Sequence, residues 1–389
     1  MSSSPHTPTQ LGSAALLAGL PMMWPHRLSV LLDAWEPVEA WNRATSARAD
    51  RLVLPDGSPL LPSGSQPTPS TVMAAWRAAA RGADPQQAIE RHAASGIEVV
   101  LRDDQRYPSS LAGDIEPPGV LFVRGDLGVI DAPRAAIVGT RRCTGVGAGV
   151  ARELGRELAA AGVVVVSGLA LGIDGAAHRG VLDTMASGEG GARPVGVVGS
   201  GLDCVYPARH KELWDAVGSS GVLLSEAPAG ARPAAWRFPA RNRMIAALAD
   251  VVVVVESHAA GGSLLTVGEA ERRDVPVLAV PGSVRSPAAA GTNQLIADGC
   301  HPVCDARDVL IALGLTPAGR RGAPKDPRPK PSDDEQRVLE AFSWEPATLE
   351  QLAVRSGLDL PTLAMALERL LTTGWVSAQG GWYERVVPQ

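Results

Sequence analysis

Three arginines stand close together in the stretch R-F-P-A-R-N-R-M-I, which runs from residue 237 to residue 245. Arg237, Arg241 and Arg243 surround Asn242. Guanidinium groups bind phosphate through paired hydrogen bonds, so this stretch has the chemistry of an anion site. The valine run 251–255 that follows predicts a strand buried on both faces, which explains packing but not the arginines.

A second group of arginines follows another predicted strand. Gly139 and Thr140 lead into Arg141 and Arg142, and glycines at 145, 147 and 149 then open a predicted helix. Backbone N–H groups at a helix start attract anions, so a free phosphate, a nucleotide or a nucleic-acid backbone would each satisfy this site. Exposed ion pairs with neighbouring acids would explain the same arginines without any ligand.

The usual nucleotide and hydrolase motifs are absent from the sequence. The glycine spacing G-x-G-x-G is one residue short of the dinucleotide fingerprint, and no acid stands about 20 residues further on to bind a ribose. Neither a G-x-x-x-x-G-K-[ST] loop nor a G-x-S-x-G nucleophile elbow occurs. These observations argue against a dehydrogenase, a P-loop NTPase and a serine hydrolase.

A second glycine-rich turn, S-G-L-A-L-G-I-D-G-A-A-H, begins at Ser167 and Gly168. Asp174 suits a helix N-cap there. His178 could act as a general base, but no nucleophile stands at a matching spacing, which favours a structural or ligand-orienting hydrogen bond.

Composition sets wider limits. The chain has 389 residues, 45% hydrophobic and 20% charged, with a net charge of −5, so contact with a polyanion would need a local basic patch. Four scattered cysteines fit a reducing cytoplasm, and Cys300-His301-x-x-Cys304 lacks the second ligand pair of a zinc site. We expect no metal, no cofactor, no secretory leader and no membrane span.

Strand and helix patterns alternate through the middle of the chain and predict an open, doubly wound parallel α/β sheet. Ligands in such sheets bind at the carboxyl ends of the strands, where the glycine and arginine candidates fall. The predicted strands cover residues 135–138, 163–167, 195–198, 222–225, 251–255 and 277–280.

Composition also divides the chain. We predict a helical domain over residues 1–106 with a Pro- and Ser-rich insertion, a Rossmann-like core over 107–313, a Pro-rich basic linker over 314–332 and a winged helix over 333–389. The segment L-P-M-M-W-P-H-R-L lacks the glycines of a DNA-binding helix-hairpin-helix turn, which favours a packing or interaction module. The helix predicted over 360–371 has few of the side chains that usually read bases. Contact with a protein and stabilisation of the fold are therefore alternatives to DNA recognition for this unit.

Six motifs in one order resemble the bacterial DNA-processing protein A family, also called DprA or Smf, over about residues 107–313. They are S-G-L-A-L-G-I-D-G-A-A-H, G-S-G-L-D-C-V-Y-P, S-E-A-P-A-G-A-R-P, R-F-P-A-R-N-R-M-I, G-G-S-L-L-T and P-G-S. The resemblance implies an extended Rossmann-like core that binds single-stranded DNA without catalysis. It also implies a homodimer that helps to load a RecA-type recombinase in natural transformation or related recombination.

The resemblance also implies a DNA- and phosphate-binding pocket. Phe238 is the aromatic nearest to the arginines, where stacking on a base competes with plain core packing, and Tyr206 is a second stacking candidate. The implied pocket residues are Gly139, Arg141, Arg142, Ser167, Gly168, Gly172, Arg237, Phe238, Arg241, Asn242, Arg243, Gly262 and Ser263.

Two other functions compete with this interpretation. The segment G-G-S-L-L-T with Glu269 resembles a degraded loop of the nucleoside-monophosphate phosphoribohydrolases, whose lysine-decarboxylase-like fold is related, and implies a nucleotide-hydrolysing enzyme. Alternatively, the flanking units recruit partners while the core only dimerises, which predicts no binding of single strands.

Overall fold

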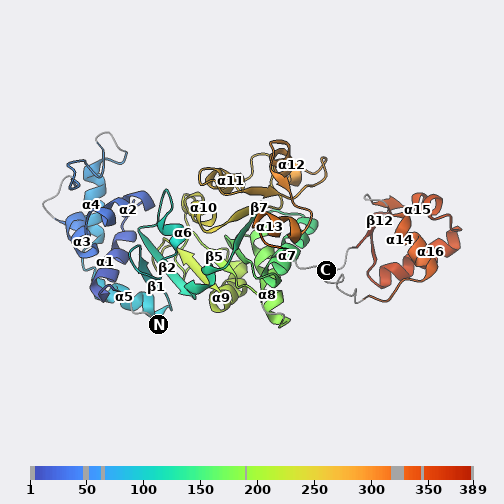
Figure 1. Ribbon diagram of the computed structural model, residues 1–389, viewed down its shortest axis with the longest axis horizontal. Helices are drawn as coiled ribbons and strands as arrows, with labels where there is room; N and C mark the ends of the chain where they lie inside the picture. Colours follow the sequence, from blue (N-terminus) through green and yellow to red (C-terminus); the bar gives the residue numbers. More distant parts are fainter. Residues whose placement is uncertain are drawn as a thin grey trace. The chain divides into compact units, whose positions relative to one another are not determined.

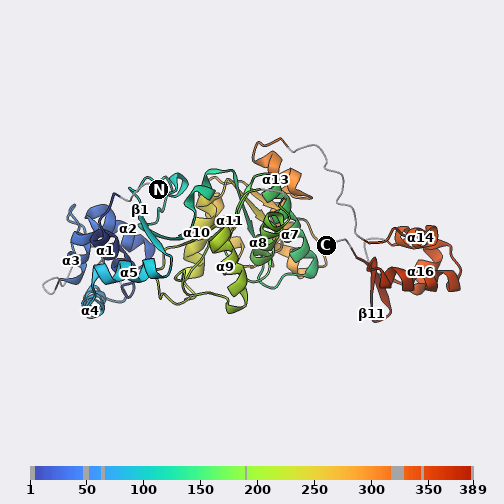
Figure 2. The same cartoon turned by 90° about the horizontal axis from the view of Figure 1, so that it is seen from below.

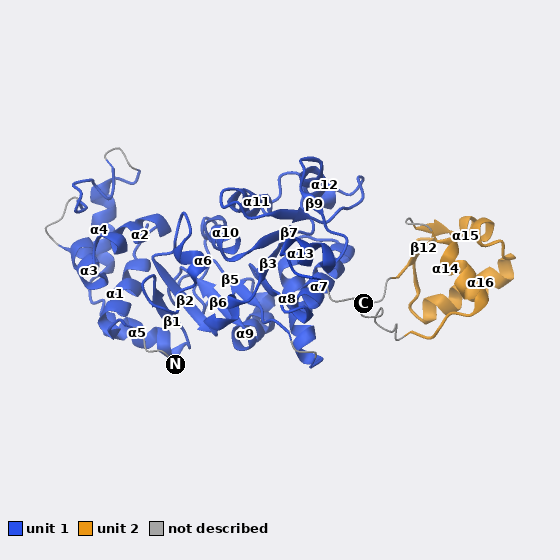
Figure 3. Cartoon of the chain, viewed as in Figure 1, with its two compact units in different colours: residues 1–317 blue, residues 318–389 orange. Residues whose placement is uncertain are grey.

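The structure is a computed structural model that describes residues 5–46, 52–62, 66–188, 191–316, 328–342 and 346–386. The chain forms two compact units, residues 1–317 and 318–389 (Figure 3). None of the described helices is long and apolar enough to cross a membrane.

A nine-stranded sheet forms the centre of the first unit, in the order β1-β2-β6-β5-β4-β3-β7-β8-β9 (Figure 1). Strands β3 to β9 run parallel, while β2 is antiparallel to both β6 and β1. The winding direction reverses between β3 and β7, which confirms the predicted doubly wound sheet. The strands are β1 (Glu98–Leu101), β2 (Val120–Gly125), β3 (Arg134–Val138), β4 (Val164–Ser167), β5 (Val195–Val197), β6 (Val222–Ser225), β7 (Val251–Val254), β8 (Val277–Ala279) and β9 (His301–Pro302).

Helices cover both faces of the sheet (Figures 1 and 2). Alternating side chains of the central strands pack against these helices. In β3, Ala135 and Ile137 share a core with α7, α8 and α13, whereas Ala136 and Val138 share one with α10 and α11. The core helices are α6 (Ser109–Ala112), α7 (Gly145–Ala160), α8 (Ile173–Ala186), α9 (Lys211–Ser220), α10 (Arg237–Leu248), α11 (Leu264–Glu271), α12 (Ala290–Ala297) and α13 (Ala306–Ala312), with short 3-10 turns at Leu127–Asp131, Ala208–His210 and Pro287–Ala289.

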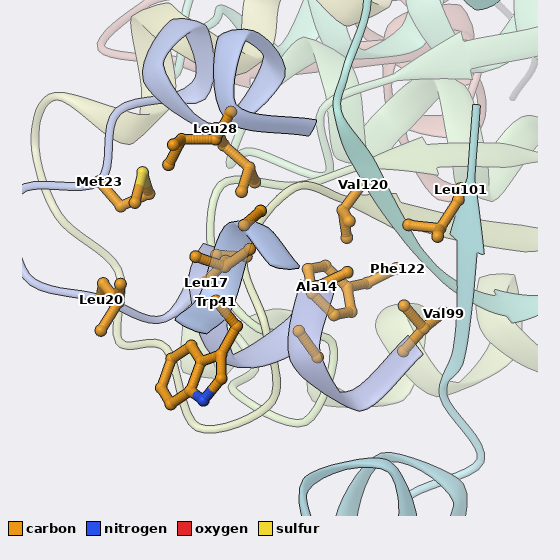
Figure 4. Packing of buried hydrophobic residues seen from close by; sticks show 14 of the residues in the cluster. Ala14, Leu17, Leu20, Met23, Leu28, Trp41, Val99, Leu101, Val120 and Phe122 are labelled. Carbon is orange, nitrogen blue, oxygen red and sulfur yellow. The ribbon is translucent and has the colours of Figure 1, made fainter. Parts of the chain in front are cut away.

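The N-terminal region is helical, as predicted, and packs directly on the sheet. Ala14 and Leu17 of α1 belong to the same buried cluster as Val99 of β1 and Phe122 of β2 (Figure 4). The helical region and the sheet thus share one continuous core, and the boundary at residue 106 stays a sequence prediction. The helices are α1 (Pro8–Ala18), α2 (Pro25–Ala34), α3 (Pro37–Thr45), α4 (Pro69–Ala79) and α5 (Pro85–Ala94).

The second unit has the winged-helix arrangement of three helices and a small antiparallel sheet in the order β10-β12-β11. Leu352, Leu363 and Leu367 are buried in its core. Thr348 and Asp359 cap two of its helices, and Gly357 separates these helices in the left-handed conformation that glycine adopts without strain. The elements are α14 (Asp333–Ala341), β10 (Ala347–Thr348), α15 (Leu349–Ser356), α16 (Leu360–Thr372), β11 (Val376–Gln379) and β12 (Trp382–Arg385).

Candidate nucleic-acid interface

An aromatic ring and an arginine meet at the start of α10. The guanidinium carbon of Arg141, which follows β3, lies 5.1 Å from the ring centroid of Phe238. The ring of Tyr206, in the loop after β5, lies 5.3 Å from that of Phe238 and is 42% exposed. A cation over an aromatic face is attracted by the ring quadrupole. Residues 141, 206 and 238 therefore form one aromatic and cationic cluster, which we call the Phe238 cluster.

A second aromatic contact lies one residue before α10. The rings of Trp236 and Trp24 are 4.4 Å apart, and the guanidinium carbon of Arg237 lies 4.9 Å from the Trp236 ring. Sequence reasoning missed both tryptophans. Trp236 adjoins Arg237 and could have been noticed in the run W-R-F, but Trp24 is far away in the chain and carries no such signal.

Arg241 lies inside the protein, although the sequence predicted contact with phosphate. It is 7% exposed, and its Nη2 donates a hydrogen bond to the carbonyl oxygen of Gly168 at 3.2 Å. Burial lowers the pKa of Arg241 to about 10, while the buried carboxylate of Asp174 favours its charge. Asp174 in turn accepts hydrogen bonds from the N–H groups of Gly168 and Ala170. Arg241 therefore connects α10 to the turn after β4.

Arg243 also pairs with an internal acid. It is 6% exposed, and its Nη2 donates to Glu226 Oε1 at 2.6 Å, just beyond the end of β6. Burial raises the pKa of Glu226, and the charge of Arg243 opposes that rise. Both guanidinium groups are thus buried and paired inside the protein, and their predicted contact with phosphate stays a prediction. Asn242, between them, is half-buried.

The glycine-rich start of α7 already holds a carboxylate of the protein itself. Glu256, just after β7, accepts hydrogen bonds from the backbone N–H of Thr144 at 2.9 Å and from its hydroxyl at 2.6 Å. A Cβ on Gly147 would lie 2.5 Å or less from the atoms of this carboxylate. An outside anion at this helix start would therefore lie close to the Glu256 carboxylate, and the predicted anion site stays a prediction. Arg141 and Arg142, just before it in the chain, are both exposed.

The loops after β3 and β4 approach each other closely. Gly172 has φ +80°, and a Cβ there would lie 2.3 Å from the Thr140 carbonyl oxygen. A Cβ on Gly139 would lie 2.6 Å from the side chain of Ile173. Ser167 is fully buried and donates to the Ile137 carbonyl oxygen at 2.6 Å. These residues shape the backbone beneath Arg141, and their place in a binding pocket stays a prediction.

Gly262 and Ser263 belong to a separate turn before α11. The hydroxyl of Ser263 is buried and donates to that of Ser257 at 2.9 Å. Within the described residues, no hydrogen bond or ring contact joins this turn to the Phe238 cluster. The structure thus brings the loops after β3 and β4 to the start of α10, and leaves 262–263 outside that group.

The remaining candidates from the sequence, a possible general base and a possible metal ligand pair, lie outside the Phe238 cluster. His178 is fully buried, its Nε2 lies 3.2 Å from the Val195 carbonyl oxygen, and burial lowers its pKa to about 4. Cys300 and Cys304 are free thiols, and the described part of the chain holds no group of His, Cys, Asp and Glu side chains that could bind a metal.

Comparison with known proteins agrees with the resemblance seen in the sequence. The family model described as DNA recombination-mediator protein A matches residues 98–314, and that of the DprA winged helix domain matches residues 322–381. The DNA processing protein DprA of Bacillus subtilis is 37% identical over 219 residues, which cover 56% of this chain and 72% of the relative. Protein Smf of Synechocystis is 30% identical over 340 residues, which cover 78% of this chain and 83% of the relative.

A solved structure has the same architecture. The X-ray structure of DNA processing protein A from Streptococcus pneumoniae is 30% identical, with a TM-score of 0.61 over 79% of this chain and 98% of that chain. The family-model match over the sheet agrees with this likeness. This chain belongs to the DNA-processing protein A (DprA/Smf) family.

Proposed function

We propose that the start of α10 binds single-stranded DNA, with the Phe238 cluster as the contact surface. The observation that carries the proposal is the placing of Phe238 between the Arg141 guanidinium and the Tyr206 ring. Proteins that bind single strands combine aromatic rings, on which unpaired bases stack, with cations that follow the phosphates. Duplex DNA keeps its bases stacked inside, so the same surface favours single strands.

In this proposal the buried arginines hold the surface in place and the exposed ones contact the strand. Arg241 and Arg243 fix α10 through the Gly168 carbonyl and Glu226. Arg141 and Arg142 are exposed and Arg237 is half-buried, so these three supply the cations for phosphate. Gly139, Gly168 and Gly172 allow the loops to pack closely beneath them.

Membership of a family described as DNA recombination mediators supports a wider role. We infer that the protein covers single strands that are taken up or processed and passes them to a RecA-type recombinase, as a homodimer in the cytoplasm. Mixing the purified protein with a RecA-type recombinase and a single strand coated by single-strand-binding protein tests the transfer. Faster filament formation supports it, and an unchanged rate contradicts it.

Nucleotide hydrolysis, the competing hypothesis, would use Glu269 as an acid or base. Glu269 instead lies in an ion-pair network, 3.3 Å from Arg272 and in contact with Arg273, which also pairs with Asp114 at 2.7 Å. We therefore propose binding without catalysis. A nucleoside-hydrolysis assay checks this, because release of free base above that of Glu269→Ala would restore the enzyme hypothesis.

Fluorescence anisotropy with matched single-stranded and duplex oligonucleotides tests the DNA proposal directly. We expect tighter binding of the single strand and a loss of about 5- to 150-fold for Phe238→Ala, since stacking on one base contributes about 1–3 kcal/mol. Trp382→Ala, at an exposed tryptophan of the second unit, is the matched control. Equal affinity for duplex, or an unchanged affinity of Phe238→Ala, contradicts the proposal.

A further inference from the structure

Trp24 is an exposed aromatic residue in a rigid turn. Its side chain is 43% exposed, whereas Trp76 and Trp214 are fully buried. The turn before it is held by hydrogen bonds: Trp76 Nε1 donates to the Pro21 carbonyl oxygen at 2.8 Å, and Arg27 donates to that of Met22 at 2.7 Å. The protein therefore fixes this ring at the surface.

The residues on either side of Trp24 anchor it to the body of the first unit. Met23 and Leu28 are buried in the cluster that joins the N-terminal helices to β1 and β2 (Figure 4). Trp24 is thus placed relative to the sheet by packed side chains on both sides, and its ring meets Trp236 at 4.4 Å. Core packing explains Met23 and Leu28 but does not explain the exposed Trp24 ring.

The contact with Trp236 lies beside the Phe238 cluster. Trp236, Arg237 and Phe238 are consecutive, so one short backbone segment carries two rings with an arginine between them. Each ring has a second ring and a guanidinium beside it: Trp24 and Arg237 for Trp236, and Tyr206 and Arg141 for Phe238. Aromatic rings on which successive bases can stack, with cations beside them, are the usual features of a surface that binds single-stranded DNA.

A small pocket separates the N-terminal helices from the ends of β5 and β6 next to these rings. Met23 and Pro25 line it from the helical region, and Trp236 and Arg237 line it from the start of α10. Glu226 also lines this pocket. The charges of Arg237 and Arg241 offset this carboxylate. The apolar surfaces of Met23, Pro25 and Trp236 are what suit a base ring.

We propose that Trp24 and Trp236 form a second base-stacking site, by which the N-terminal helical region takes part in binding the strand. The occupant is an unpaired nucleobase of the same strand that contacts the Phe238 cluster. This inference rests on the proposed function and extends it, because the bound DNA strand would run from the loops of the sheet to the N-terminal helices.

Strand length provides the test. Single strands of about 4 and about 16 nucleotides span the usual range of site sizes. We expect Trp24→Leu, which keeps apolar bulk but removes the ring, to weaken binding of the longer strand about 5-fold or more and to leave the shorter one unchanged. Trp24→Phe should keep most of the affinity, and Trp382→Ala should keep all of it.

Strands that lack bases at one end separate stacking from a structural effect. If Trp24 stacks on a base, Trp24→Leu should not lower the affinity for an oligonucleotide that already lacks its bases at the end that reaches Trp24. Equal binding of the long strand by Trp24→Leu and Trp24→Phe, or an equal loss with and without the bases, overturns the inference. A loss for Phe238→Ala alone leaves the proposed function standing without the second site, and no binding by the unchanged protein refutes the proposed function itself.

Discussion

The guanidinium of Arg241 fills the space in front of Gly168 that any side chain at residue 168 would need. An added Cβ would lie 1.7 Å from Arg241 Nη1 and 2.5 Å from its central carbon. Arg241 is buried and its charge is favoured by Asp174, so moving the guanidinium aside would weaken these interactions. The absence of a side chain at 168 is therefore what lets α10 lock onto the turn after β4.

Gly168→Ala should destabilise the protein. The methyl group displaces a buried guanidinium from its carbonyl partner, and overpacking of this kind costs about 1–3 kcal/mol. Urea denaturation measures the change in the free energy of unfolding. Gly262→Ala is the matched control, because its Cβ would meet no atom within 4 Å. Equal stabilities for the two variants would contradict the role given to Gly168.

Removing exposed arginines should change the salt dependence of binding. Each phosphate contact to a single strand contributes about 0.7 to the slope of log affinity against log salt concentration, because counterions are released. We expect Arg141→Ala and Arg142→Ala each to reduce the slope by about that amount. Arg152→Ala, which removes an exposed arginine already paired with Asp183 at 2.6 Å, should leave the slope unchanged. The contact assignment fails if all three variants keep the original slope.

Arg243→Ala should mainly lower the stability of the folded protein, rather than its affinity for DNA. It leaves Glu226 buried without its partner, and breaking a buried pair costs about 3–5 kcal/mol. Thermal unfolding followed by circular dichroism measures the loss, with Arg142→Ala as the exposed control. A variant as stable as the parent but weaker in binding DNA would instead mean that Arg243 contacts phosphate directly, as its sequence context predicted.

His178 should make stability depend on pH. Burial lowers its pKa from 6.5 to about 4, so as the pH falls the unfolded chain takes up the proton first. Its contribution is complete above about pH 6.5 and is lost as the pH falls towards about 4, at no more than about 1.4 kcal/mol per pH unit. In His178→Gln the amide can still donate to Val195 but does not titrate.

Urea denaturation at about pH 7 and about pH 5 checks this, each on one side of the ordinary histidine pKa. The free energy of unfolding should fall less in His178→Gln than in the parent. Equal falls would mean that other groups carry the pH dependence.

The sequence predicted the sheet because its strands are runs of β-branched residues, and valines 251–255 need no further information to be recognised as buried. It also predicted that the loops after β3 and β4 meet, since the carboxyl ends of parallel strands share one edge. The direction of a guanidinium was not predictable. Arg241 and Arg243 are drawn inwards by Asp174, in the first turn of α8, and by Glu226, just after β6, and neither acid stands next to them in the chain.

Trp24 shows a second limit of prediction from sequence. Its partner Trp236 is more than 200 residues away, and only the packing of α1 and α2 on the sheet brings the two rings together. The turn whose missing glycines favoured a packing or interaction module presents an exposed aromatic ring, and no local pattern in the chain reveals its contact with Trp236.

Glu256 places a carboxylate at the point where the winding of the sheet reverses. In doubly wound sheets the crevice where the winding reverses normally receives the ligand, and here that crevice lies between β3 and β7. The Glu256 carbonyl oxygen accepts from Thr140 N–H at 2.8 Å, and its carboxylate accepts from Thr144. A mononucleotide entering the crevice would place its phosphate against this negative charge. In the proposed function, a DNA strand that lies across the outer loops avoids this carboxylate, which would therefore disfavour a small anionic ligand more than an extended one.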